Sequence, residues 1–217
     1  MGLLGPIDWQ RAIDMIIILL IAIDVHELAH AVVADRLGDS TPRRMGELSL
    51  NPFVHMDQIG VMLLLLTSIT AFGFTYGRTH VSPGNLKFGP QRGNAIVAIA
   101  GPLSNLALAA LSAIPLTLAA GGTIQLSTDV QYFLELAMVL NVLLFVINLI
   151  PIPPLDGFTV LGGFLTARQM YSLAPLQQWG PLIILILFVA NPGDVFGSIV
   201  RPAMDQILHI LCSSCYV

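Results

Sequence analysis

The stretch MIIILLIAIDVHELAHAVVADRL, residues 15–37, decides the fold of this chain. It is apolar over Met15–Ile23, passes through a polar run at residues 24–30, and becomes apolar again until Asp35. A helix that crosses a bilayer needs about 20 largely apolar residues. The residues before this stretch mix acidic and basic side chains, and no small-x-small site follows it. We therefore expect a retained transmembrane helix and not a cleaved signal peptide.

The whole chain has the composition of a membrane protein. Of its 217 residues, 55% are apolar and 10% are charged, and the mean hydropathy is +0.82. An ordinary soluble domain has about 25% charged residues. The net charge of -4 excludes the basic footprint of a nucleic-acid binder, and two cysteines cannot hold together a secreted disulfide scaffold. We predict one membrane-embedded domain over residues 1–217. It is expected to contact the lipid bilayer and to bind no nucleic acid.

The apolar segments predict an all-α polytopic membrane protein, with a bundle of about four to six transmembrane helices. These segments are residues 9–37, 58–77, 93–128, 136–155 and 169–193, with a weaker helix within 195–217. The two polar stretches, 38–57 and 78–92, contain several prolines and glycines and are typical of loops. We expect short β-hairpin elements there, with candidate strands at Gly46–Leu50 and Thr79–Ser82.

The polar run inside the first apolar segment contains the pattern H-E-x-x-H at His26-Glu27-Leu28-Ala29-His30. On a helix, residues four apart point to the same side, so His26 and His30 can bind one zinc ion. Glu27 is then placed to take a proton from water at the metal. Ionisable residues in a membrane helix are costly and usually functional. The alternative is that both histidines only form hydrogen bonds between helices, with Glu27 as a partner.

A zinc ion bound by two histidines needs a third protein ligand, and Asp156 is the best candidate. It follows Pro151, Pro153 and Pro154, which cannot continue a helix. We therefore expect irregular backbone near membrane depth, which is tolerated only where it lines protein or a water-filled cavity. The alternative is a carboxylate at a helix end, at the membrane interface.

Four motifs together resemble the site-2 protease family of intramembrane zinc metalloproteases. They are H-E-L-A-H at 26–30, L-N-P-x-x-H-x-D at 50–57, A-G-P-x-x-N at 100–105 and N-x-x-P-x-x-x-L-D-G at 148–157. The resemblance covers residues 9–165 and is to the short form, without a PDZ or CBS domain. The chain departs from the short members at Thr79–His80, where they usually carry Pro-Val.

The resemblance implies that His26, His30 and Asp156 bind zinc and that Glu27 is the catalytic acid and base. Asn148 is similar to a family asparagine that polarises the substrate carbonyl or stabilises the oxyanion. The catalytic core is expected at residues 9–165, with accessory helices at 169–217.

The implied substrate is a transmembrane segment of another protein. It would be cut in regulated intramembrane proteolysis or in clearance of signal-peptide remnants. The substrate must unwind before attack, and an exposed strand edge could then hold it. The expected location is the cell membrane of a prokaryote, with several passes.

The distribution of charge predicts the topology. Arg36, Arg43 and Arg44 follow the first span, which places its C-terminal end in the cytoplasm. Asp156 must lie at the same depth as the histidines. We therefore expect residues 58–77 to re-enter the membrane without crossing it, and the cation-free connection Gly121–Gln131 to lie outside.

Two other functions fit some of these residues. One is a zinc-binding membrane scaffold without proteolysis, and the other is a metal transporter. Neither gives Glu27 a use beside the histidines. Asp24 either supports the zinc ligands or forms an interhelical hydrogen bond. Close helix packing is the favoured role for Gly101 and Asn105, and Cys212 and Cys215 are interpreted as small residues at a helix end. His55, Asp57 and the oligomeric state are left without an assignment.

Overall fold

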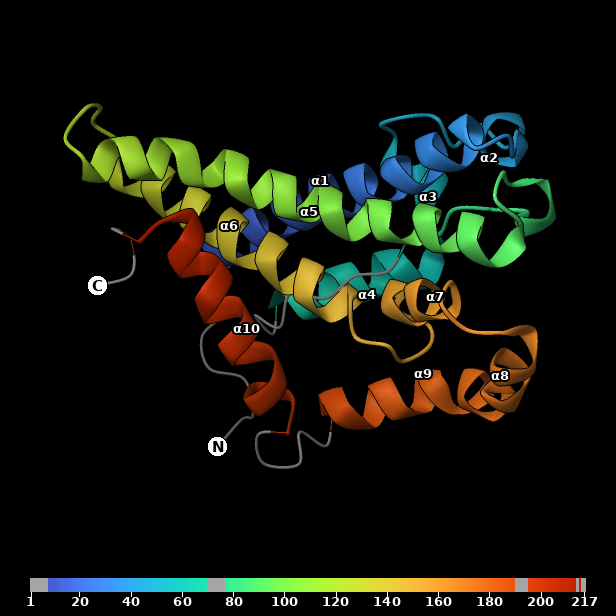
Figure 1. Cartoon of the computed structure of the whole chain (residues 1–217). Coiled ribbons are helices and arrows are strands. Elements are labelled where there is room, and N and C mark those ends of the chain that lie inside the picture. Colours follow the sequence, from blue (N-terminus) through green and yellow to red (C-terminus); the bar gives the residue numbers. More distant parts are fainter. Residues whose placement is uncertain (1–7, 70–76, 190–194, 214, 216–217) are drawn as a thin grey trace.

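The computed structural model describes residues 8–69, 77–189, 195–213 and 215, and its regular elements are all helical (Figure 1). Their order and bounds are α1 Trp9–Arg36, α2 Thr41–Arg44, α3 Pro52–His55, α4 Gln58–Ile69, the 3-10 helix η1 Pro83–Asn85, α5 Pro90–Ala120, α6 Thr128–Asn148, α7 Asp156–Gly162, α8 Ala167–Ser172, α9 Ala174–Val189 and α10 Val195–Leu211. The expected all-α class is confirmed.

The expected β-hairpin elements are wrong for the two candidate strands, because neither Gly46–Leu50 nor Thr79–Ser82 pairs with another strand. The reason is visible in the hydrogen bonds of the second segment. The backbone N–H groups of His80 and Ser82 donate to the carboxylates of Glu47 and Asp39. These side chains occupy the donors that a neighbouring strand would need.

Among the residues that the structure describes, three helices are long and apolar enough to cross a membrane: α1 with 28 residues, α5 with 31 and α6 with 21. The predicted four to six spans are therefore not confirmed. The shorter helices α4, α9 and α10 have 12, 16 and 17 residues. The helix α6 ends at Asn148 because the prolines from Pro151 onward cannot extend it.

The helix α5 packs along both α1 and α6, which makes it the centre of the bundle (Figure 1). Small side chains such as Ala109 and Ala113 are fully or almost fully buried and let α5 approach α6 and α10 closely. A second apolar cluster joins α1, α4 and α6 through Leu19, Leu64 and Leu140. The polar residues of α1 are thus surrounded by helices on several sides.

The residues that precede α4 and those that follow residues 70–76 lie next to each other. The backbone N of Arg78 donates to the carbonyl O of His55 at 2.9 Å. His55 ends α3, just before α4 begins, and Arg78 follows residues 70–76, which lie outside the described part. The two ends of segment 56–77 are therefore neighbours in space.

The connection after α1 is held by the buried carboxylate of Asp39. Its Oδ1 accepts from the backbone N of Thr41 at 3.0 Å and from the side chain of Asn85 at 3.2 Å, while Oδ2 accepts from the backbone N of Ser82 at 2.6 Å. Burial opposes ionisation of Asp39, but the bonds from Thr41, Ser82 and Asn85 outweigh it and lower the pKa of Asp39. Asp39 thus ties residues 82–85 to the end of α1.

Replacing Asp39 by Asn should lower the free energy of unfolding at pH 7 by about 1–3 kcal/mol, because buried donors lose a charged acceptor. Because the pKa of Asp39 is lower in the folded protein, ionised Asp39 contributes its full stabilisation at pH values above the unfolded pKa of about 3.9. This contribution is lost as the pH falls through the pKa of the folded protein. The difference in Tm between wild type and Asp39→Asn, measured in detergent, should be equal at pH 7 and pH 5 and shrink below about pH 4.

Asp35→Asn is the matched control, because it breaks an exposed ion pair with Arg43. It should change the Tm much less than Asp39→Asn. Equal changes in the two variants would contradict the structural role of Asp39.

Candidate metal centre

The structure brings together the three residues that the sequence predicts as zinc ligands. His26 and His30 lie one turn apart on α1, and their ring centroids are 4.7 Å apart. Asp156, the first residue of α7, places its Oδ2 at 3.0 Å from His26 Nε2 and 3.4 Å from His30 Nε2. All three ligand atoms lie within 4.8 Å of one another.

The other ring nitrogens determine how both histidines are protonated. His26 Nδ1 lies 2.6 Å from Oδ1 of Asn105, and His30 Nδ1 lies 2.8 Å from the carbonyl O of Val97. Since both partners are acceptors, each Nδ1 carries a proton and each Nε2 of a neutral ring presents a lone pair. Two lone pairs and a carboxylate oxygen can then face a single cation.

A chain of amides fixes the acceptor beside His26. The side-chain N of Asn105 donates to the carbonyl O of Ala22 at 3.2 Å and to Oδ1 of Asn141 at 3.1 Å. The side-chain N of Asn141 donates in turn to the carbonyl O of Ala137 at 2.9 Å. Both asparagines are buried, so α5 and α6 together hold the oxygen of Asn105 toward the ring of His26.

Gly101 provides the space in which the two imidazole rings lie. A Cβ atom at this position would come within 2.3 Å of His30 Nε2 and 2.5 Å of His26 Nε2. The interpretation of Gly101 and Asn105 as helix packing is therefore incomplete, because both contact the histidines. The A-G-P-x-x-N pattern contained this signal, but only the packing of α5 on α1 shows it.

The irregular segment between α6 and α7 positions Asp156 at the site. The turn that contains Pro151, Pro153 and Pro154 leads directly into α7. Gly157 allows this return, since a Cβ there would lie 2.3 Å from the carbonyl O of Leu149. Asp156 thus starts a helix that folds back against the end of α6 and points its carboxylate at α1.

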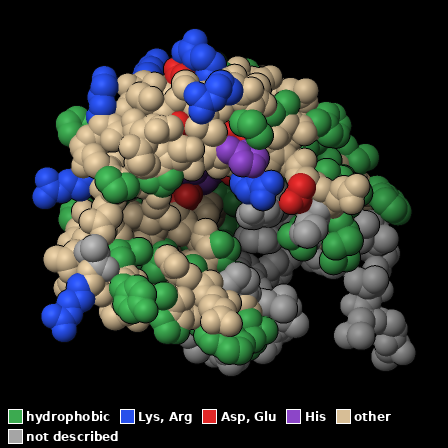
Figure 2. Space-filling view, turned by 90° about the vertical axis from the view of Figure 1, so that its right-hand side faces the viewer, with side chains coloured by type: hydrophobic (Ala, Val, Ile, Leu, Met, Phe, Trp, Pro, Cys, Tyr) green, Lys and Arg blue, Asp and Glu red, His purple; other side chains and the backbone are tan. Residues whose placement is uncertain are grey.

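Glu27 lies beside the histidines, against a cavity of about 360 Å³ that these residues line together with Asn148. The carboxylate of Glu27 is buried, with 6% of the residue exposed. The hydroxyl of Thr79 lies 2.8 Å from Glu27 Oε2. Figure 2 shows this end of the molecule hollowed, with Lys and Arg side chains spread over the face around the hollow.

The remaining residues singled out in the sequence have distinct surroundings. Asn148 lines the cavity, and its side-chain N donates to the carbonyl O of Leu144 at 3.0 Å. Asp24 lies 3.7 Å from the fully buried His55, which connects α1 with α3. This contact joins α1 and α3 as an ion pair, but within the described residues Asp24 Oδ1 forms no hydrogen bond, so the predicted interhelical hydrogen bond is not confirmed. Asp57 accepts from the backbone N of Gly60 and so begins α4.

The donor set fits a zinc ion. Tetrahedral zinc with ligand distances of about 2.0–2.2 Å separates its donors by about 3.3 Å, close to the separations of Asp156 from both histidines. Because Gly101 has no Cβ, there is space for both imidazole rings beside α5. The oxygens that accept from the two Nδ1 atoms leave both Nε2 lone pairs facing the site. The residues present can therefore hold one zinc ion with three protein ligands.

Comparisons with known proteins agree with this chemistry. Residues 112–189 match the family described as Peptidase family M50. The chain is 33% identical over 203 residues to "Putative zinc metalloprotease YwhC" of Bacillus subtilis, with 90% of each protein covered. It is also 33% identical over 175 residues to a protein of Mycolicibacterium smegmatis named as the zinc metalloprotease Rip2, covering 78% of this chain and 64% of that protein. No solved structure matches.

Replacing Gly101 by Ala should abolish high-affinity zinc binding, because the added methyl group would overlap both Nε2 atoms. The purified wild type should hold about one zinc per chain, as expected for a single site of three protein ligands. The variant should hold much less zinc, since loss of even an outer hydrogen-bond partner typically costs about 10-fold or more in affinity and this change displaces the ligands themselves. Elemental analysis of the detergent-purified protein measures both values.

Gly121→Ala is the control, since its Cβ would have no neighbour closer than 3.5 Å. This variant should keep its zinc. Full zinc content in Gly101→Ala would show that the metal binds elsewhere.

Proposed function

Since the chain is a metalloprotease that belongs to peptidase family M50, the site-2 proteases, we propose that it cleaves peptide bonds within or near transmembrane segments of other membrane proteins. The convergence of His26, His30 and Asp156 beside Glu27 is the observation that carries this proposal. Zinc, which the relatives' names imply, fits the geometry of the three ligands. A bound zinc ion would supply a Lewis acid that activates water and polarises the scissile carbonyl.

Glu27 would act as the general base and then as the general acid. Its carboxylate takes a proton from the attacking water and passes it to the leaving amine. Its position next to His26 on α1 places it beside the site, and it lines the same cavity. A purely structural zinc site has no need of this carboxylate.

Asn148 would stabilise the oxyanion that develops on the scissile carbonyl. Its side-chain N has two protons, and one of them is donated to the carbonyl O of Leu144. The second proton can be donated to a substrate oxygen in the cavity. Asn148 and Asp156 approach the cavity from α6 and α7, opposite the histidines on α1.

The depth of the site supports a substrate inside the membrane. The first charged residue after His30 is Asp35, so His30 lies between one and two turns, and His26 between two and three turns, from the charged end of α1. A helical substrate has its carbonyls hydrogen-bonded and its backbone covered by side chains. It must therefore unwind before water can attack, and glycine or proline in the substrate would make unwinding easier.

The two ends of the bundle support a multi-pass orientation with the active site toward the cytoplasm. Arg43, Arg44, Lys87 and Arg92 are exposed in or next to the connections after α1 and before α5. Figure 2 shows Lys and Arg side chains around the hollow, and cytoplasmic loops are typically rich in such cations. The bond between Arg78 and His55 brings together both ends of segment 56–77, as a re-entrant segment requires. We infer that segment 58–77, to which α4 belongs, dips into the membrane from the cytoplasm without crossing it.

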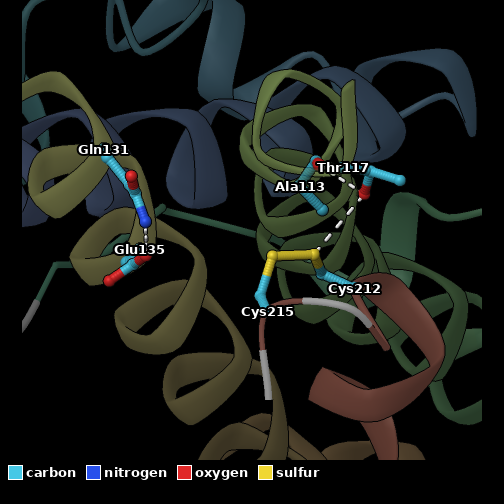
Figure 3. Close-up of a disulfide and its surroundings, with 6 residues drawn as sticks. All are labelled: Ala113, Thr117, Gln131, Glu135, Cys212 and Cys215. Carbon is cyan, nitrogen blue, oxygen red and sulfur yellow. Dashed lines mark hydrogen bonds between the residues drawn. A yellow bond between two sulfur atoms is a disulfide. The ribbon is translucent and has the colours of Figure 1, made fainter. Parts of the chain in front are cut away.

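The opposite end of the bundle carries a disulfide, contrary to the interpretation of its cysteines as small helix-end residues. Cys212 and Cys215 are bonded (Figure 3). Cys215 lines a pocket with Ile124, from the connection between α5 and α6, and Gln131, from the start of α6. Disulfides persist in oxidising compartments and are rare in the cytosol. This end is therefore assigned to the outside of a prokaryotic cell membrane.

Replacing Glu27 by Gln should abolish cleavage and leave zinc bound, because the amide cannot accept the proton but is not needed as a ligand. A loss of at least about 100-fold is expected from the usual contribution of a general base. Single-span membrane proteins and signal-peptide remnants, co-reconstituted with the protease in liposomes, provide the substrates. Cleavage is followed on gels and zinc by elemental analysis.

Glu135→Gln makes the same chemical change at the other end of the bundle, where Glu135 accepts from the side chain of Gln131. It should cleave like the wild type. Cleavage retained in Glu27→Gln would overturn the protease mechanism, and zinc without cleavage in the wild type would favour the zinc-binding scaffold.

Single cysteines test the orientation. In intact cells, a membrane-impermeant maleimide should label Thr123→Cys, between α5 and α6, and should not label Lys87→Cys until the cells are opened. The native cysteines should stay unlabelled until an impermeant reductant is added. Labelling of Lys87→Cys from outside, with Thr123→Cys protected, would exclude this topology, in which α1 ends in the cytoplasm and segment 58–77 does not cross the membrane.

A further inference from the structure

The segment Gly77–His80 passes directly over Glu27. A Cβ at Gly77 would lie 2.8 Å from Glu27 Cγ and 2.9 Å from Glu27 Oε1, so only glycine allows this approach. Arg78 and Thr79 line the same cavity as Glu27. This segment, residues 77–80, is called the strap below, and it contains the Thr79–His80 pair at which the sequence departs from the short family members.

Thr79 is the residue of the strap that contacts the reactive group. Its hydroxyl oxygen lies 2.8 Å from Glu27 Oε2 and 3.0 Å from the backbone O of Glu27. A hydroxyl has one proton, and a bond to an ionised carboxylate is stronger than a bond to a neutral carbonyl. Thr79 therefore donates to Oε2 whenever Glu27 is ionised.

Within the described part of the chain, no other donor reaches the carboxylate of Glu27. The carboxylate is buried, and the backbone of the strap lies against it. A bond from Thr79 to Oε2 leaves Oε1 as the oxygen that can accept a proton from water.

The strap itself is fixed on both sides of Thr79. The backbone N of Arg78 donates to the carbonyl O of His55 at 2.9 Å. On the other side, the backbone N of His80 donates to Glu47 Oε2 at 2.9 Å, and the ring of His80 bonds to Glu47 Oε1. Glu47 is 2% exposed, so this anchor is buried. The position of the Thr79 hydroxyl is therefore determined by contacts outside the cavity.

We propose that Thr79 is a positioning residue that orients the carboxylate of Glu27 for proton transfer. This inference rests on the proposed function, because it needs Glu27 to be the general base. It adds a residue that the zinc and proteolysis motifs do not contain.

The test compares Thr79→Val, which removes the hydroxyl at nearly constant shape, with Thr79→Ser, which keeps it. In the liposome assay, Thr79→Val should lower kcat about 10-fold or more with KM and zinc content unchanged, as expected for a lost hydrogen bond to a charged group. Thr79→Ser should restore most of the rate. Thr117→Val, which removes a hydroxyl bonded to the carbonyl O of Ala113 within α5, should cleave like the wild type.

A second measurement does not depend on cleavage. Thr79→Val should lower the Tm in the wild-type background and have a smaller effect in Glu27→Ala, because the partner of the hydroxyl is already gone. If Thr79→Val fails to fold, Thr79→Ala replaces it in both measurements.

Wild-type kcat in Thr79→Val, or equal Tm changes in both backgrounds, would overturn the inference. This result is distinct from the failure of the proposed function, in which Glu27→Gln itself would still cleave.

Discussion

The structure depends on one constraint: two histidines and a glutamate on a membrane helix need polar partners away from bulk water. The bundle supplies such partners from several helices and loops. Asn105 on α5 and the carbonyl of Val97 accept from the Nδ1 atoms, Asp156 on α7 faces the Nε2 atoms, and Thr79 donates to Glu27. Each of these partners comes from a different point of the chain, so the site exists only when the bundle is assembled.

The sequence was sufficient to predict the helical class and to select the residues that converge. The H-E-x-x-H motif places its two histidines on one side of a helix, because residues four apart share a helix face. Asp156 could be selected because the prolines before it force the backbone to turn at membrane depth. The structure brings these residues within reach of one zinc ion, and their role as ligands remains a prediction until the metal is measured.

The contacts made across helices could not be predicted in this way. Asn105 and Gly101 act through the approach of α5 to α1, and no spacing within α5 reveals which face meets the histidines. The segment Thr79–Ser82 was predicted to be a strand. The N–H groups of His80 and Ser82 instead bond to Glu47 and Asp39, which are 33 and 43 residues earlier in the chain. Local patterns predict the conformation of a segment, whereas its partners depend on the tertiary fold.

The distance along the chain between His26 and Asp156 has a consequence for biosynthesis. These residues are 130 positions apart, and α5 and α6 lie between them. A growing chain that has inserted α1 therefore carries the two histidines and the glutamate but lacks the third ligand until both later helices are in the membrane. The order of translation thus delays formation of the complete ligand set until the surrounding bundle is present.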